Sequence, residues 1–314
     1  MPDIDLSVIV PVKNVESCID DIVSDIKCEC AGLRFEIIIT DLNSTDNSVG
    51  AAFDALENNS VSGTVIRCGS DVPGCALNSG IDRSRGKYIT FVFPRKMYVN
   101  CISDYYKDIE NKNAEFAFAP APFDCKKGII LTDKSSFYDI FDGIMYGKAS
   151  CDIASVMISS DFLKENGICF SETLTYGYSD DFITKMLIKC KNIAVSSAKP
   201  ERKVYPGAPK SYYESITESM RLDRLEAAVD LIKSASGDDE KHIRIKKMLC
   251  GQKIPSLIFN CIDGLLSDNY TVSAIKSVLK SRNYDIYLRP GKLTSPKLKQ
   301  RILLWRLAPF LYKK

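Results

Sequence analysis

The chain has 314 residues, of which 45% are hydrophobic and 26% charged, which is the balance of an ordinary soluble globular protein with a sizeable core. Its formal net charge is +2, but residues 289–314 hold eight Lys or Arg and no acidic residue. The remainder has 34 basic against 40 acidic residues, or −6. Polynucleotide binding usually needs a basic face spread over a domain, so this distribution argues against a nucleic-acid partner.

The cysteines and the single histidine indicate neither a disulfide framework nor a zinc site. Twelve cysteines are scattered along a long chain in which we find no signal-peptide pattern, so we expect reduced thiols in a cytoplasmic protein. Cys28 and Cys30 form a CxC pair, but no second cluster with zinc spacing accompanies them, and His242 lies in a Lys-rich stretch. No run approaches the roughly 20 apolar residues of a membrane span.

The first hundred residues alternate between two kinds of apolar pattern. Short β-branched runs predict strands buried on both faces, and the segments between them have apolar residues at helical spacing. This alternation predicts a mostly parallel sheet flanked by helices. The expected strands are residues 7–12, 35–40, 63–68 and 87–93, and the expected helices are residues 18–26, 48–56 and 74–86.

The second of these strands ends in an acidic residue, Asp41, which is followed by the turn and helix-cap residue types Asn43 to Asp46. Ligands of open α/β sheets bind outside the carboxyl ends of the strands, so we expect a nucleotide here. The alternative interpretation is that Asp41 and Asp46 only cap the next helix.

The C-terminal half is predominantly helical. A strand over Ser155–Ser159 precedes a short helix, and Asp180 and Asp181 then open an apolar-periodic helix, where two acids would be favourable on the helix dipole alone. From Lys210 the pattern is helical, with Pro255 interrupting one segment. The basic end, residues 295–314, mixes Lys and Arg with Trp, Leu and Phe. Its composition favours a membrane-surface anchor slightly over a helix docked on the protein.

Three segments together resemble the motifs of family 2 glycosyltransferases, which are inverting enzymes of the GT-A fold. They read SVIVPVKNVE, EIIITDLNSTDNS and ALNSGIDRSRGKYITFVF, and a later segment, GICFSETLTYGYSDDFITKMLIKCKNIAV, resembles the acceptor side of the family. The resemblance covers about residues 5–205. It implies a GT-A domain over residues 1–205 and leaves residues 206–314 as a helical region with a basic tail.

The resemblance also implies how a nucleotide-sugar is held, with a weak preference for a UDP-sugar. In the family, backbone around the end of the first strand and the first aspartate of the second motif hold the base, and that aspartate can accept a hydrogen bond from uracil. The nucleotide-binding set expected on this basis is Pro11, Val12, Asn14, Glu16, Asp41, Asn43 and Asn78.

Inverting sugar transfer needs a base for the acceptor hydroxyl and a cation for the departing diphosphate. The resemblance assigns the base to Asp180, and an alignment shifted by one residue would assign it to Asp181. The D-x-D metal motif of the family is replaced by Phe93-Pro94-Arg95 followed by Lys96, so we expect no divalent metal there.

Arg95 and Lys96 have three interpretations. They can act as the fixed cation of a metal-independent enzyme, because guanidinium and ammonium groups pair with phosphate oxygens. They can mark a degenerate, non-catalytic homologue that serves as a binding or scaffolding subunit, an interpretation that Leu77 also favours because it replaces the arginine of the family; Lys13 likewise replaces an aromatic residue of the first motif. They can also be an ordinary exposed basic turn.

We therefore expect a hexosyltransferase-like enzyme that moves a sugar from a nucleotide-sugar to a glycan or lipid-linked acceptor in cell-surface polysaccharide synthesis. Its expected location is the cytoplasm, at the inner face of the membrane if the basic tail contacts lipid. The degenerate homologue, with an active glycosyltransferase as its partner, is the alternative.

Overall fold

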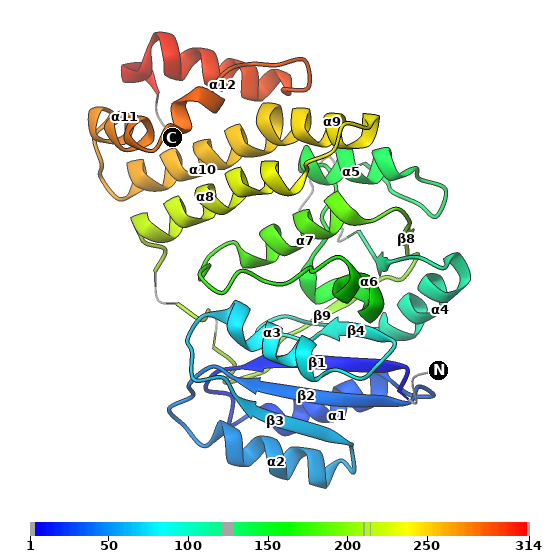
Figure 1. Cartoon of the computed structure of the whole chain (residues 1–314). Helices are drawn as coiled ribbons and strands as arrows, with labels where there is room; N and C mark the ends of the chain where they lie inside the picture. The colour runs from blue at the N-terminus through cyan, green and yellow to red at the C-terminus, as the bar shows by residue number, and fades with distance from the viewer. Residues whose placement is uncertain (1–3, 121–128, 210, 214, 313–314) are drawn as a thin grey trace. The chain divides into compact units, whose positions relative to one another are not determined.

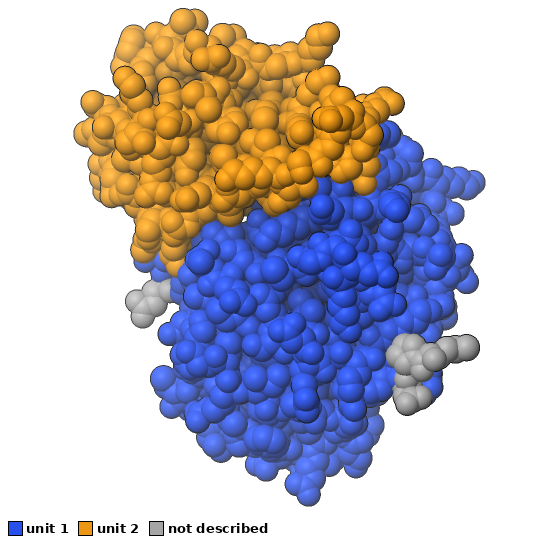
Figure 2. Space-filling model, in the orientation of Figure 1, with its two compact units in different colours: residues 1–215 blue, residues 216–314 orange. Residues whose placement is uncertain are grey.

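The computed structural model describes residues 4–120, 129–209, 211–213 and 215–312. The chain divides into two compact units, residues 1–215 and 216–314 (Figure 2). No helix among the described residues is long and apolar enough to cross a membrane.

The sheet of the first unit is built around β1 (Leu6–Val12), which pairs in parallel with β2 (Phe35–Asp41) and with β4 (Tyr88–Phe91) (Figure 1). β3 (Gly63–Arg67) continues the parallel arrangement beside β2. Every residue of β1 is buried, so both faces of this strand are covered. The predicted mostly parallel sheet flanked by helices is confirmed.

The other half of the sheet includes antiparallel pairs. β7 (Val156–Ser159) runs antiparallel to both β4 and β6 (Phe116–Phe118), and β8 (Ile193–Val195) is parallel to β6. The strand order is β3-β2-β1-β4-β7-β6-β8. A separate antiparallel pair joins β5 (Met97–Val99) to β9 (Glu201–Lys203).

Helices of the first unit connect and cover these strands. α1 and α2 pack against each other, α3 packs against β1 and β2, and α4 packs against β6, β7 and β8 (Figure 1). Their bounds are α1 Ile19–Glu29, α2 Ser48–Asn58, α3 Pro73–Arg83, α4 Ile102–Lys112, α5 Phe137–Met145, α6 Ser160–Glu165 and α7 Tyr178–Lys189.

The fourth strand is shorter than the sequence predicts. It ends at Phe91 rather than Phe93, and Phe93 pairs instead with Lys96 across a tight turn. Pro94 lies in this turn, and a proline has no N–H to donate to a neighbouring strand. The turn fixes Arg95 just beyond the carboxyl end of β4.

A buried carboxylate fastens the amino ends of the central strands. Glu36 is 2% exposed and accepts hydrogen bonds from the Ser7 hydroxyl (2.7 Å) and from the guanidinium of Arg85 (2.7 and 3.0 Å). The Gly86 N–H donates to Ser7 at 2.9 Å, and a Cβ at Gly86 would lie 2.5 Å from the Ser7 backbone nitrogen. Only glycine permits this close approach.

We predict that Glu36→Gln lowers the free energy of unfolding by about 2 kcal/mol, because it removes charge-assisted hydrogen bonds in a buried site. Burial raises the pKa of Glu36, but the bonds from Arg85 and Ser7 outweigh it and leave the pKa below its usual value. The contribution is therefore present above the unfolded pKa and is lost as pH falls through the folded one.

Urea titrations at neutral and acidic pH measure this effect, with Glu57→Gln as the control on the exposed face of α2. Equal stabilities of the two variants at neutral pH would contradict the structural role given to Glu36.

The second unit is helical, as predicted. α9 continues through a π-helical turn, Leu249–Lys253, into α10, and Pro255 stands in the first turn of α10, where a missing N–H is tolerated. The helix bounds are α8 Glu218–Ser234, α9 Glu240–Met248, α10 Ile254–Ser267, α11 Val272–Ser281 and α12 Pro296–Leu307.

One face of the basic helix α12 packs against the rest of the second unit. Its residues Leu298, Ile302 and Trp305 are buried. Arg301 donates to the Asp263 carboxylate at 2.8 Å, and the Tyr312 hydroxyl donates to the same carboxylate at 2.9 Å. The remaining apolar residues of this end of the chain are exposed, namely Leu303, Leu304, Leu307, Phe310 and Leu311.

Candidate active site

The loops that follow β1 and β2 emerge side by side, because Val12 and Asp41 are partners in the parallel register. Asn14 and Asn43 have φ angles of 54° and 51°. Asparagine tolerates this left-handed conformation better than most residues, so both positions suit the sharp turns made here.

Side chains of the two loops bind each other. The side-chain oxygen Oδ1 of Asn14 accepts from the Thr45 N–H at 2.8 Å, and the backbone N–H of Asn14 donates to the Ser44 hydroxyl at 2.9 Å. The Glu16 carboxylate accepts from the Asn47 N–H at 2.9 Å. Asn14 and Glu16 thus shape the edge of the candidate site, and a direct contact with nucleotide stays a prediction for both.

Asp41 is 1% exposed, and both its carboxylate oxygens lie 3.3 Å from the Ser44 N–H. One long, shared bond leaves acceptor capacity on a carboxylate that has about four lone-pair positions. Asp46 instead accepts from the N–H of Ser48, the first residue of α2, at 3.0 Å. The capping interpretation therefore describes Asp46 well. Asp41 retains acceptor capacity, and its contact with a nucleotide stays a prediction.

Asn78 holds α3 to the segment that leads into α7. Its amide donates to the Phe170 carbonyl (3.0 Å) and to the Glu172 carboxylate (3.0 Å), and it accepts from the Phe170 N–H (2.9 Å). A Cβ at Gly74 would lie 2.1 Å from the Ser171 carbonyl oxygen, so the close contact requires glycine. These bonds give Asn78 a positioning role, and its nucleotide contact stays a prediction.

Arg95 lies in the middle of a series of side-chain contacts that connects β1 with α7. Its guanidinium donates to the Tyr178 hydroxyl at 2.9 Å and lies 4.2 Å from the centre of the Tyr212 ring. The Tyr212 hydroxyl donates to the backbone oxygen of Pro11 at 2.9 Å. Pro11 and Arg95, predicted from separate motifs, are thus linked through one half-buried tyrosine.

α7 begins at Tyr178, directly after Gly177, whose φ of 85° turns the chain into the helix. Asp181 is buried and pairs with Lys185 at 2.8 Å. Burial raises the pKa of Asp181, and the Lys185 ammonium opposes this only in part. Asp180 is half-buried in the same first turn. Of the two predicted carboxylates, Asp180 is the more accessible to an acceptor.

Lys96 differs from its neighbour Arg95 because its ammonium forms an ion pair with Asp152. The Tyr98 hydroxyl is 3.4 Å from the same carboxylate. Burial opposes the charged lysine, but the pairing with Asp152 outweighs it and raises the pKa of Lys96. Lys96 therefore has a carboxylate partner. Among the described residues, Arg95 is instead in contact with a hydroxyl group and an aromatic ring.

Sequence reasoning missed Asp152, Tyr178 and Tyr212. Tyr178 stands two residues before Asp180, so its helix could have suggested it. Asp152 and Tyr212 lie far from Lys96 and Arg95 in the sequence, and no local pattern marks them. The described residues contain no group of three or more His, Cys, Asp or Glu side chains arranged to hold a metal ion.

Comparison with known proteins first defines the class. The fold is similar to that of S. aureus TarS 1–349 in complex with UDP-GlcNAc, with a TM-score of 0.62 and 16% identity over 94% of this chain and 83% of that one. It also resembles mannosyltransferase PcManGT from Pyrobaculum calidifontis in complex with GDP-Man and Mn²⁺, with a TM-score of 0.51 and 13% identity over 97% and 85% of the two chains. The fold is therefore of the GT-A type.

A family model matches the first part of the sequence. Residues 7–92 match the model described as "Glycosyl transferase family 2", and these residues contain the first two N-terminal motifs and all but the last residue of the third. The match is to family 2 over residues 7–92, as the motifs predict, and the fold is of the GT-A type. Among curated proteins, no sequence matches significantly.

The contact between Lys96 and Asp152 makes a testable structural prediction. We expect Lys96→Gln and Asp152→Asn each to lower the free energy of unfolding, and the double variant to lose less than the sum, with a coupling of about 1 kcal/mol. The figure is modest because the Lys96 side chain is 31% exposed. A double-mutant cycle measured in urea gives the coupling, and strictly additive losses would contradict the pairing.

Proposed function

We propose that the chain is an inverting glycosyltransferase that moves a sugar from a nucleotide-sugar, with UDP weakly preferred, to a glycan or lipid-linked acceptor. The observation that carries the proposal is the position of Arg95. It is linked through Tyr212 to Pro11, in the first motif, and through Tyr178 to the start of α7. A cation is thus held between the segment expected to bind the nucleotide and the segment expected to supply the base.

Each residue has one role in this reaction. Asp41 accepts a hydrogen bond from the nucleotide base, and the loops joined by Asn14 and Glu16 hold that part of the site in place. Asp180 takes the proton of the acceptor hydroxyl while its oxygen attacks the anomeric carbon. The bond to the nucleoside diphosphate breaks with its electron pair on the leaving oxygen, and Arg95 stabilises the negative charge that develops there.

The proposed mechanism needs no divalent metal at the carboxyl end of β4. The side chains that follow this strand include Arg95 and Lys96, and cations do not fit a metal site. Asp152 is the carboxylate that contacts this turn, and it is paired with Lys96. A planar guanidinium can bind two phosphate oxygens at once, so Arg95 is suited to the diphosphate.

The acceptor is proposed to belong to cell-surface polysaccharide synthesis at the inner face of the membrane. The support comes from the end of the second unit, where residues 289–314 carry eight cations and no acid. Leu307 and Phe310 are 80% and 76% exposed there. Cations beside exposed apolar side chains suit an anionic membrane surface.

A second candidate function is the degenerate homologue that binds a partner glycosyltransferase. Tyr178 and Tyr212 contact the guanidinium of Arg95, and Lys96 is committed to Asp152. In this alternative, these contacts are permanent, and neither cation is available to bind a diphosphate. Direct binding of nucleotide separates the two functions.

We predict that UDP or another nucleoside diphosphate binds equally well with EDTA and with manganese, as measured by isothermal titration. Arg95→Ala should lower turnover by about 10²–10³-fold, because one preorganised electrostatic partner of the transition state is lost. Arg83→Ala, at an exposed position of the same unit, is the matched control.

Manganese-dependent tightening would overturn the metal-free mechanism. Absence of nucleotide binding under both conditions would favour the degenerate homologue.

The two carboxylates of α7 give a further prediction. Asp180→Asn should abolish turnover and spare nucleotide binding, because it removes the base and leaves the nucleotide contacts. Asp181→Asn should instead spare turnover and should not lower stability at neutral pH, because burial raises the pKa of Asp181 and makes its ionised form unfavourable in the folded protein. Turnover, nucleotide affinity and urea stability are measured on both variants. If Asp181→Asn alone abolished turnover in a stably folded protein, the roles of the two residues would be exchanged.

A further inference from the structure

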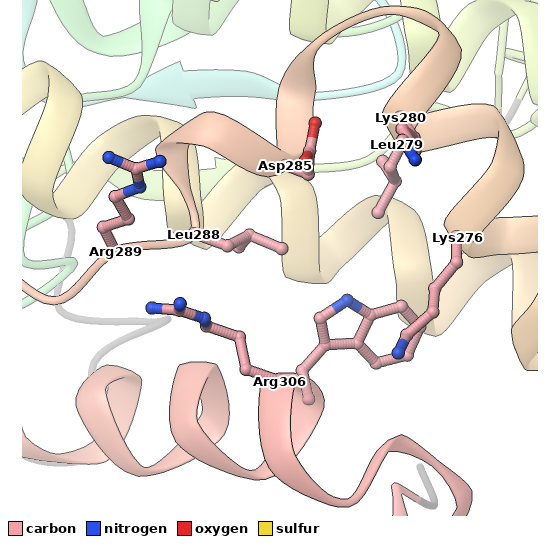
Figure 3. A pocket seen from close by; sticks show the side chains of 8 residues that line it. Lys276, Leu279, Lys280, Asp285, Leu288, Arg289 and Arg306 are labelled. Atoms are coloured by element: carbon pink, nitrogen blue, oxygen red, sulfur yellow. The ribbon is translucent and has the colours of Figure 1, made fainter.

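The second unit contains a cavity of about 310 Å³ that the proposed reaction does not use. Three segments line it: α11, the chain from the short helix Tyr284–Tyr287 to Arg289, and α12. Pockets of this size hold small organic molecules or a polar headgroup. The lining residues are Lys276, Leu279, Lys280, Asp285, Leu288, Arg289, Trp305 and Arg306, and we call this cavity the cationic pocket (Figure 3).

The charge of the cationic pocket is strongly unbalanced, with four cations against the one carboxylate of Asp285. In the part of the chain that the structure describes, none of the four forms an ion pair. Lys276 lies over the Trp305 ring at 5.9 Å. In Figure 3, the Arg289 and Arg306 side chains extend on the same side of the cavity, and Lys276 lies on the opposite side. Like charges gathered without a partner favour an anionic ligand.

The wall of the cationic pocket includes buried core residues, whereas its cations are accessible. Leu279, Leu288 and Trp305 are 1%, 3% and 4% exposed and belong to the core of the unit. The cationic side chains are exposed. Guanidinium groups such as those of Arg289 and Arg306 are suited to planar, bidentate binding of phosphate oxygens.

Exposed apolar residues are neighbours in sequence of residues that line the cationic pocket. Leu307 follows Arg306 directly and is 80% exposed, and Ile286 follows Asp285 and is 50% exposed. Leu303 and Leu307 are four residues apart on α12, so they lie on one face of the helix. A soluble phosphate compound would leave these side chains in water, whereas a lipid membrane would cover them.

We propose that the cationic pocket binds the phosphate of an anionic phospholipid, with Arg289 and Arg306 on its oxygens and Leu303, Leu307 and Phe310 in the interfacial layer. The inference rests on the proposed contact of the basic end with the membrane and gives that contact a specific site. A phosphomonoester headgroup, as in phosphatidic acid, fits better than a phosphodiester because it offers more charge and more free oxygens to two arginines.

The experiment compares two double variants of the full chain that remove the same charge from the same segment. Arg289→Gln with Arg306→Gln removes the pocket cations, and Lys292→Gln with Lys297→Gln removes exposed cations that do not line it. Point substitutions are preferred to truncation, because α12 buries Trp305 and its loss would expose the core. Sedimentation is measured with vesicles of phosphatidylcholine alone, with phosphatidylglycerol, and with phosphatidic acid at matched surface charge.

We expect the wild-type protein to bind phosphatidic acid vesicles most tightly. The pocket variant should lose about tenfold in affinity for each arginine, the value of one charge-assisted hydrogen bond. The control variant should lose about fivefold in vesicle affinity for each lysine, because each contributes only non-specific electrostatic attraction. This loss should be equal on phosphatidylglycerol and phosphatidic acid vesicles. Equal losses for the two variants, or no preference for phosphatidic acid, would overturn the pocket as a lipid site.

Free ligands distinguish the source of the phosphate. Titration of the wild-type protein with glycerol 3-phosphate tests a soluble ligand, and tight binding that needs Arg289 and Arg306, without vesicle binding, would overturn the lipid assignment. Nucleotide-sugar binding by the wild-type protein is measured on the same samples. Vesicle binding without nucleotide-sugar binding would overturn the proposed glycosyltransferase function and leave the lipid site standing. Nucleotide-sugar binding without vesicle binding would overturn only the lipid site.

Discussion

The candidate active site depends on the parallel register between β1 and β2. Seven consecutive residue pairs join these strands, from Leu6 with Phe35 to Val12 with Asp41. Because both strands end at the same level, their loops emerge together and can bind each other through Asn14 and Glu16. A shift by one residue would move each side chain to the other face of the sheet. The buried bonds of Glu36 at the opposite end help to keep the register.

The position of α7 depends on a second set of contacts, which are aromatic. The rings of Phe170 and Phe182 are stacked at 3.8 Å, and Phe91 at the end of β4 meets Phe170 edge-on at 5.5 Å. Asn78 holds the backbone of Phe170 from α3. The first turn of α7, with Tyr178 and Asp180, is therefore fixed against the strand from which Arg95 follows. The packed core thus positions a cation and a carboxylate that are far apart in sequence.

Local pattern was sufficient to predict the first half of the fold. β1, β2 and β4 are buried on both faces, and a strand of that kind has a distinctive composition. β3 is only half-buried, but its β-branched run was still recognisable, so all four strands were found within a few residues. The segment from Lys96 to Ala154 gave little signal, since β5 and β6 are three residues long and their pairing depends on distant partners. The antiparallel insertion of β7 between β4 and β6 is likewise a property of the tertiary structure.

In the candidate site, too, some features could be predicted from neighbouring residues, whereas others depend on residues far away in the sequence. Asp41, Arg95 and Asp180 each follow or begin an element that the sequence predicts, so their positions could be predicted. What could not be predicted is which charges already have partners. Asp152 pairs with Lys96, and Lys185 pairs with Asp181. In the sequence, however, Lys96 looked equivalent to Arg95, and Asp181 to Asp180. In the proposed reaction, Arg95 interacts with the donor diphosphate and Asp180 with the acceptor hydroxyl. The chemistry proposed for the chain therefore rests on one cation and one carboxylate, each adjacent to a residue of the same charge that has a structural role.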